Sequence, residues 1–139
     1  NMIGKNEGGW STVVISALDD RIKNGFAISS SFPLWMSPNE KNFGGYEHHL
    51  PSFYQIANYL ELYSMSAYGD DQSLTLFYNE FDPCCFSGEL YKKFPFENVV
   101  KSKLKLLGNG TFNVLIDNNQ RENIVSNNTL EIINKSLLK

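Results

Sequence analysis

The chain has 139 residues, of which 42% are hydrophobic and 14% aromatic, and it carries 12 Lys and Arg against 15 Asp and Glu. This composition excludes a charge-rich disordered chain, and no apolar run approaches the roughly 20 residues that a bilayer-spanning helix needs. We therefore expect a single globular domain over residues 1–139. The polar N-terminal stretch shows no secretory signal, so the protein is expected to be cytoplasmic, with Asn1 a leftover residue before a natural start at Met2.

The first predicted structure is an N-terminal β-hairpin. Residues 10–18 are rich in β-branched side chains, and residues 26–30 alternate between apolar and polar. Between them, Asn24-Gly25 offers the backbone conformations that a tight hairpin turn requires.

Residues 32–50 show no periodicity and are predicted to form a long surface loop. Such a loop either folds its apolar side chains back onto the core or presents them as a binding surface. The apolar residues of this loop are Leu34, Trp35, Met36 and Phe43, and its interrupting residues are Pro33, Pro38, Gly44 and Gly45.

A helix over residues 53–67 is predicted next, with Ser52 as its N-cap, Gln55 completing a capping box and Gly69 ending it. Apolar residues at helical spacing mark the face that should pack on the sheet. The residues of that face are Phe53, Ile56, Ala57, Leu60, Tyr63 and Ala67.

The remaining chain is predicted to be mostly strands, over residues 73–79, 89–92, 100–106, 112–116 and, at an edge, 123–126. The third and fourth form a hairpin, because lysines alternate with apolar residues before the Gly108-Asn109-Gly110 turn. A helix over residues 97–107 is the alternative, since Val100, Leu104 and Leu107 also fit helical spacing. Asn128 is expected to cap a final helix. This order predicts an α+β fold, with one antiparallel sheet of about five to six strands and two helices packed on it.

Two histidines and two cysteines are the candidates for metal or nucleophile chemistry. They are adjacent pairs, His48-His49 and Cys84-Cys85, and neighbours on an extended segment point to opposite sides, so no metal site is expected. Two reduced thiols without a catalytic role are the favoured interpretation. The enzyme alternative is a small hydrolase or transferase that uses one cysteine with one histidine. The sequence contains no nucleotide, phosphate or cofactor motif, so no cofactor is expected.

Carboxylates at predicted turns and element ends form the remaining candidate site. They are either solvated turn residues or a docking patch for a basic protein, with exposed aromatic side chains as anchors. Residues 1–98 hold six Lys and Arg against twelve Asp and Glu, which argues against a nucleic-acid partner. The candidate partner-binding residues are Asp19, Asp20, Asp70, Asp71, Glu80, Asp82, Trp35 and Tyr46.

Two short stretches, Gly8-Gly9-Trp10-Ser11-Thr12-Val13 and Asn24-Gly25-Phe26-Ala27-Ile28-Ser29, resemble the opening of small bacterial immunity proteins from contact-dependent growth inhibition systems. The resemblance covers about the first thirty residues. It implies a non-enzymatic protein that binds one cognate toxin, usually a nuclease, and blocks its active site or substrate path. An immunity protein or antitoxin for a basic, nuclease-type toxin is therefore the leading hypothesis. A phage-encoded inhibitor of a host complex is the second, and the oligomeric state is left open.

Overall fold

The centre of the molecule is a four-stranded, all-parallel sheet. The computed structural model describes residues 1–36, 45–118 and 120–138, and these form six α-helices around that sheet. The predicted α+β fold with an antiparallel sheet and two helices is therefore wrong, and the fold is α/β. The strands, in spatial order, are β1 (Met2–Lys5), β2 (Asn24–Ile28), β3 (Ser73–Asn79) and β4 (Thr111–Asp117).

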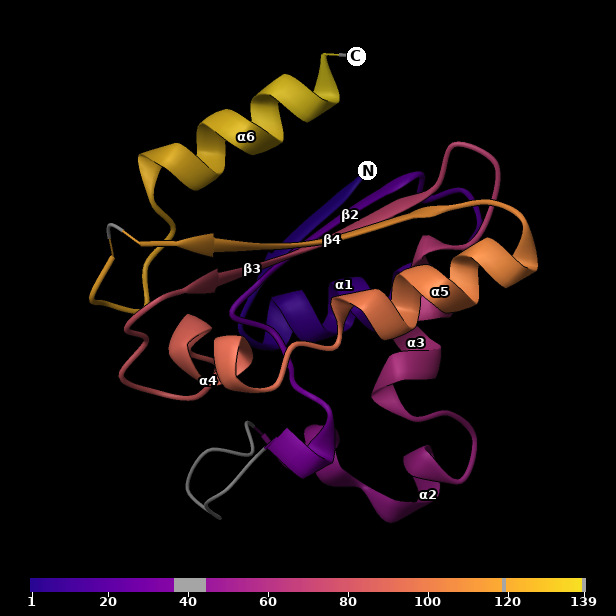
Figure 1. Ribbon diagram of the computed structural model, residues 1–139, viewed down its shortest axis with the longest axis horizontal. Coiled ribbons are helices and arrows are strands. Elements are labelled where there is room, and N and C mark those ends of the chain that lie inside the picture. The colour runs from indigo at the N-terminus through magenta and orange to yellow at the C-terminus, as the bar shows by residue number, and fades with distance from the viewer. Residues whose placement is uncertain (37–44, 119, 139) are drawn as a thin grey trace.

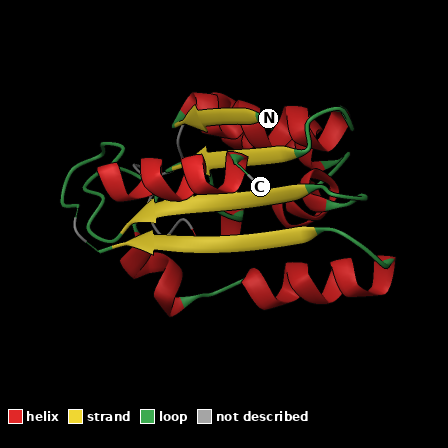
Figure 2. Cartoon of the chain, turned by 90° about the horizontal axis from the view of Figure 1, so that it is seen from above, coloured by secondary structure: helices red, strands yellow, loops and turns green. Residues whose placement is uncertain are grey.

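Each strand pairs only with its neighbours in sequence, and helices connect successive strands. Phe26 in β2 pairs with Ile3 in β1 and with Thr75 in β3. Parallel connections are almost always right-handed, so connections that all step in one direction place their helices on one face. Accordingly, α1 (Glu7–Leu18), α3 (Tyr59–Ala67) and α5 (Glu97–Leu107) cover one face, here the inner face. The helix α6 (Asn127–Leu137) lies alone on the opposite, outer face (Figures 1 and 2).

Helix α1 occupies the segment predicted as the first strand. Its β-branched residues favour a strand locally, but packing against the sheet decides the outcome. A Cβ on Gly4 would come 2.0 Å from the carbonyl oxygen of Gly8, so strand β1 and helix α1 approach closely. Residues Asn24 and Gly25 begin β2 and form no hairpin turn. The buried residues of α1 follow helical spacing and are mostly small: Gly9, Thr12, Val13 and Ser16.

The predicted helix over residues 53–67 is two helices, α2 (Pro51–Tyr54) and α3. Asn58 caps α3 through a capping box with Glu61, because each side chain accepts a hydrogen bond from the other residue's backbone N–H, at 3.1 and 2.8 Å. Of the predicted packing face Ala57, Tyr63 and Ala67 are buried, whereas Ile56 is 86% exposed. The buried apolar residues of α3 are Tyr59, Leu62, Tyr63 and Ala67.

The later elements confirm some predictions and correct others. The strand over residues 73–79 is confirmed, but residues 89–92 lie in the helix α4 (Gly88–Lys93). The predicted hairpin is wrong, because its first half is the helix α5, the stated alternative, which buries Val100 and Leu104 one turn apart. Its second half, residues 112–116, is confirmed as a strand within β4. Residues 123–126 are irregular, and Ser126 is the N-cap of α6 in place of Asn128.

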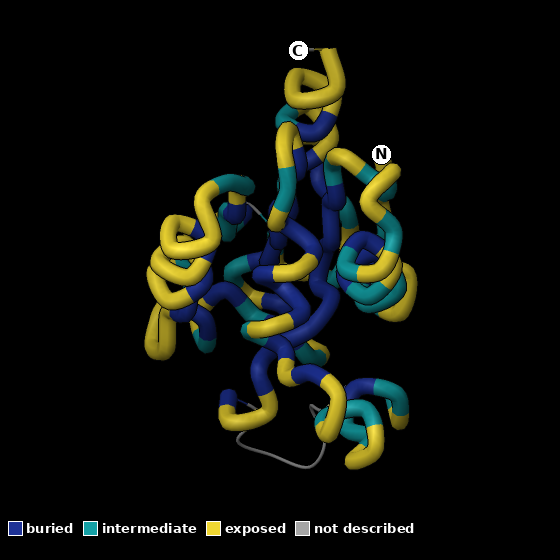
Figure 3. The backbone as a smooth tube through the Cα atoms, turned by 90° about the vertical axis from the view of Figure 1, so that its right-hand side faces the viewer, coloured by how far each residue is buried: buried dark blue, intermediate teal, exposed yellow. Residues whose placement is uncertain are grey.

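The main core lies between the inner face and its helices, and it is rich in aromatic side chains. Tyr63 stacks on Phe96 and on Phe112, with ring centroids 5.3 and 5.7 Å apart. A smaller cluster of four buried residues holds α6 on the outer face: Phe26, Ile28, Phe77 and Ile133. Figure 3 shows the buried segments running through the middle of the molecule, whereas α6 is largely exposed.

Candidate functional site

Four of the six predicted carboxylates come together at one edge of the sheet. Because all strands run in one direction, the loops before β2, β3 and β4 lie at the same end, here called the amino edge (Figure 1). Asp19 and Asp20 belong to the α1–β2 loop, and Asp70 and Asp71 to the α3–β3 loop. Gln72 links the two loops, since its Nε2 donates to the backbone oxygen of Asp20 at 2.8 Å.

The charge at the amino edge is only partly neutralised. The carboxylate of Asp19 forms an ion pair with Arg21 at 2.6 Å, and hydrogen bonding to that guanidinium lowers the pKa of Asp19 to about 2. Asp20, Asp70 and Asp71 are exposed and have no salt-bridge partner among the residues that the structure describes. Three carboxylates therefore remain to meet a positively charged partner.

A cleft of about 680 Å³ opens beside these carboxylates on the outer face, below the C-terminal part of α6. A second hollow, of about 470 Å³, adjoins it through Gln72 and reaches Asp20. Polar side chains from three strands, two loops and α6 line the larger cleft, among them Asp70, Asp71, Thr75, Asn109, Asn113 and Ser136.

The backbone of two loops shapes the cleft. Gly110 has φ +109°, and a Cβ there would lie 2.1 Å from the carbonyl oxygen of Ala67, so only glycine lets the α5–β4 turn approach the end of α3. Asp71 has φ 59°, a left-handed conformation that Asp and Asn adopt more readily than most residues. Asn109 then donates from Nδ2 to Asp70 at 2.6 Å, which joins the two loops.

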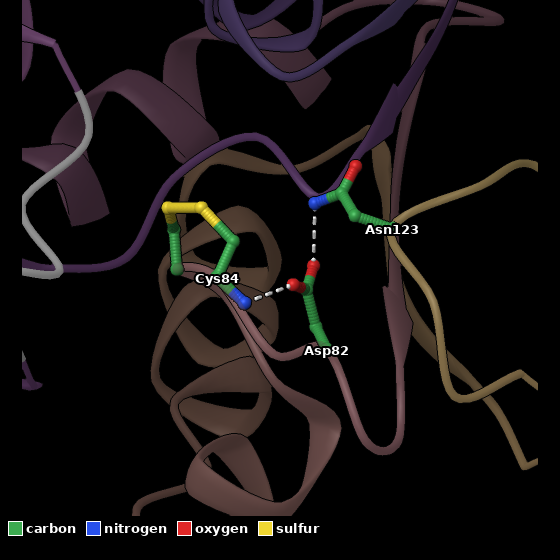
Figure 4. Close-up of a disulfide and its surroundings, with 4 residues drawn as sticks. Asp82, Cys84 and Asn123 are labelled. Atoms are coloured by element: carbon green, nitrogen blue, oxygen red, sulfur yellow. Dashed lines mark hydrogen bonds between the residues drawn. A yellow bond between two sulfur atoms is a disulfide. The ribbon is translucent and has the colours of Figure 1, made fainter.

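Glu80 and Asp82 lie at the opposite end of the sheet, here called the carboxyl edge, because they follow β3. Asp82 is only 8% exposed. One of its oxygens accepts a hydrogen bond from the backbone N–H of Cys84, and the other accepts one from the Asn123 side chain, both at 2.8 Å (Figure 4). Glu80 forms an ion pair with Lys92. These two carboxylates serve internal contacts and do not join the other four.

Cys84 and Cys85 are joined by a disulfide (Figure 4). The expectation of two reduced thiols is therefore wrong for this structure. In the disulfide state neither sulfur is a thiolate, and the thiolate is the form that attacks a substrate.

His48 is buried beside this loop and serves internal contacts. Its ring packs 5.6 Å from that of Phe86, and its Nδ1 lies 3.0 Å from the hydroxyl of Tyr59. That hydroxyl accepts a hydrogen bond from Trp10 Nε1 at 2.8 Å, so its own proton is available to Nδ1. Burial lowers the pKa of His48 and raises that of Tyr59, which keeps both groups neutral near pH 7.

The two predicted aromatic anchors are exposed, but they follow the carboxyl end of β2. Trp35 is 61% exposed and packs edge-on against Phe94, and Tyr46 is 70% exposed and packs against His49. They belong to short 3₁₀ helices, η1 (Leu34–Met36) and η3 (Tyr46–His49). The other predicted loop residues Pro38, Phe43 and Gly44 lie outside the described residues.

Sequence reasoning found the aspartates of the cleft but missed its amide and hydroxyl groups. Thr75 looked like an ordinary strand residue, and Asn109 looked like part of a hairpin turn. Only the parallel topology brings them together, since it pairs the start of β3 with the start of β4 and places the loops before these strands side by side. The glycines on both sides of Asn109 were the one local signal of a close approach.

Within the described ranges, no three His, Cys, Asp or Glu residues are grouped so that they could hold a metal ion. None of the helices in that part of the chain is long and apolar enough to span a bilayer. A scan against protein-family models gave no match, and neither did searches of curated proteins and of solved structures. The proposed function therefore depends on the geometry of this chain.

Proposed function

We propose that this chain is a non-enzymatic protein-binding inhibitor of the immunity-protein type, which neutralises a basic, nuclease-type toxin through its amino edge. The observation that carries the proposal is the set of exposed carboxylates of Asp20, Asp70 and Asp71, which have no salt-bridge partner in the described chain and lie around two adjoining hollows. Paired carboxylates bind the guanidinium groups of a partner through charge-assisted hydrogen bonds. A negatively charged rim also steers a basic protein toward it and speeds association.

The carboxyl edge supports the same proposal, because its reactive side chains are engaged with one another. Parallel α/β sheets usually bind small ligands at the carboxyl ends of their strands. Here the reactive groups of that region contact one another: Cys84 is bonded to Cys85, and His48 to Tyr59. This arrangement argues against the cysteine-dependent enzyme. A phage-encoded inhibitor of a host complex would use the same acidic surface, and the identity of the partner separates the two.

The test is the affinity of the purified chain for the basic protein encoded next to its gene, measured by calorimetry. The variant Asp70→Lys with Asp71→Asn adds three positive charges at the amino edge, and Asn at position 71 preserves its left-handed backbone. The control, Glu122→Lys with Glu89→Gln, adds the same three charges at exposed positions elsewhere. We expect at least about tenfold weaker binding for the first variant, and near wild-type affinity for the control.

Salt provides the second readout. Between about 0.1 M and about 1 M NaCl the Debye length falls from about 10 Å to about 3 Å, so the association rate of the wild type should fall. The amino-edge variant should lose most of that salt dependence, whereas the control should retain it. Equal losses in the two variants, or binding that ignores both salt and mutation, would place the interface elsewhere, for example at Trp35 and Tyr46.

A further inference from the structure

The cleft on the outer face has an unusual floor for a parallel sheet. Residues at alternate strand positions face the α6 side, and at the register of Ile28 and Phe77 they are apolar. One step toward the amino edge Phe26 is apolar, but its neighbours Thr75 in β3 and Asn113 in β4 are polar. The helix α6 covers the apolar half, and its Ser136 reaches the rim of the polar half. The polar half is therefore a recess with three kinds of wall: strand, loop and helix.

Several oxygen atoms around this recess lack a hydrogen-bond donor. Thr75 is only 8% exposed, yet its hydroxyl forms no hydrogen bond within the described chain. The Oδ1 atom of Asn109 is buried and likewise has no partner there. Asp70 uses one oxygen to accept from Asn109, and the carboxylate of Asp71 accepts no hydrogen bond from the described residues. Buried polar groups are normally paired, so the buried Oδ1 of Asn109, with the open oxygens of Thr75 and Asp71 around the same recess, points to a bound donor.

We propose that this recess binds an arginine side chain of the protein partner, an inference that rests on the proposed function. A guanidinium group carries five N–H donors, no acceptor and a permanent positive charge, which complements two carboxylates and two unpaired oxygens. The ammonium of lysine presents three donors around one point and matches a spread set of acceptors less well. A neutral polyol adds acceptors of its own and gains nothing from the charge of Asp70 and Asp71. The recess is thus the specific part of the acidic amino edge.

The test uses Nα-acetyl-arginine methylamide as the probe, followed by two-dimensional NMR of the labelled full chain. We expect saturable shifts in the amide signals of residues 69–75 and 109–113. The citrulline analogue has the same shape without the charge and should bind at least about tenfold more weakly, and the lysine analogue should fall between them. An equal response to citrulline, no saturation at tens of millimolar probe, or shifts centred on other residues would overturn the proposal.

Two variants separate the recess from a general charge effect. Thr75→Val keeps the volume of the side chain and all charges but removes the unpaired hydroxyl, so it should weaken the arginine probe severalfold. Asp71→Asn should weaken it further, and Glu122→Gln, which removes the same charge elsewhere, should leave binding unchanged. If Asp71→Asn and Glu122→Gln weaken the probe equally, the probe senses only net charge, and if Thr75→Val leaves the affinity unchanged, the recess is not its site.

The outcome also distinguishes this inference from the proposed function. Saturable arginine binding without any effect of the amino-edge variant on the protein partner would retain the recess and reject the inhibitor interface. Loss of partner binding in that variant, with no response to the arginine probe, would retain the interface and reject the arginine subsite.

Discussion

At the carboxyl edge Asp82 and Asp117 are buried and accept hydrogen bonds from other parts of the chain, whereas at the amino edge Asp20 and Asp71 are exposed and form no salt bridge with the described residues. Asp82 accepts two hydrogen bonds from protein donors, and Asp117 accepts from Ser126 and Thr129 at the start of α6. Asp20 and Asp71, in contrast, form no side-chain hydrogen bond in the described chain. The difference separates residues that hold the fold together from residues that are free to bind a partner, although their chemistry is the same.

The largest expected effect is at Asp82. The variant Asp82→Ala removes a buried carboxylate that accepts two hydrogen bonds, from the Cys84 backbone and the Asn123 side chain, so the free energy of unfolding should fall by about 3 kcal/mol. The matched variant Asp20→Ala, at an exposed position, should change it by less than about 0.5 kcal/mol. Urea denaturation measures both values. Similar losses at the two sites would contradict the separation of the edges.

Two glycines of α1 provide the next comparison. A Cβ at Gly9 would come 2.7 Å from the Cβ of Ser30, at the carboxyl end of β2, whereas a Cβ at Gly8 meets nothing within 4 Å. Gly9→Ala should therefore cost about 2 kcal/mol through overpacking, and Gly8→Ala should stabilise by up to about 1 kcal/mol through helix propensity. Thermal unfolding of both variants tests this. Stabilisation by both would show that α1 can move away from the sheet.

A smaller effect is expected in the pH dependence of the free energy of unfolding, because of His48. Burial lowers the pKa of His48 in the folded chain, while the unfolded chain takes up that proton near pH 6.5. The unfolded state therefore binds more protons below that pH, and the free energy of unfolding should fall as the pH drops from about 7 to about 5.5. His48→Gln should reduce this pH dependence, whereas His49→Gln should retain it. An unchanged pH dependence in His48→Gln would contradict the prediction.

The smallest effect is expected at Asp71. Its exposed carboxylate accepts no hydrogen bond from the described residues, so Asp71→Asn removes no contact of the fold and keeps a side chain that tolerates φ 59°. The variant should be neutral or should stabilise the fold by up to about 0.5 kcal/mol, even as it weakens the arginine probe. Urea denaturation measures the change in stability, and titration with the arginine probe measures the change in binding. A clear loss of stability would assign Asp71 to the fold instead.

The sequence predicted some elements well because their local and tertiary signals agree. The strand over residues 73–79 combines β-branched and aromatic residues with burial, and every position from 74 to 79 is buried. Helix α5 appeared only as the alternative to a hairpin, because lysines at 101, 103 and 105 alternate like a strand. The buried Val100 and Leu104 follow the helical period, and they determined the structure.

Helix α1 shows why the topology was mispredicted. Its β-branched residues indicate a strand, and once a strand is assumed there, Asn24-Gly25 becomes a hairpin turn and the sheet becomes antiparallel. The small residues Gly9, Thr12 and Ser16, spaced three or four apart, carried the opposite information. The same error hid the candidate site, because an antiparallel sheet mixes loops that precede and follow strands at each edge. The aspartates were visible as charges, but their neighbours Thr75 and Asn109 were not.

Because each strand pairs only with the strands next to it in sequence, the sheet can grow in chain order. As the chain leaves the ribosome, the unit from β1 to β2 is complete before β3 appears, and β4 then adds to a finished edge. The recess is assembled from residues 24 to 136, so its walls meet only after α6 has reached the outer face. A nascent chain that stops after β4 would thus hold its inner layer of helices but no complete recess. Capture of a partner would then wait until α6 has been synthesised and has docked.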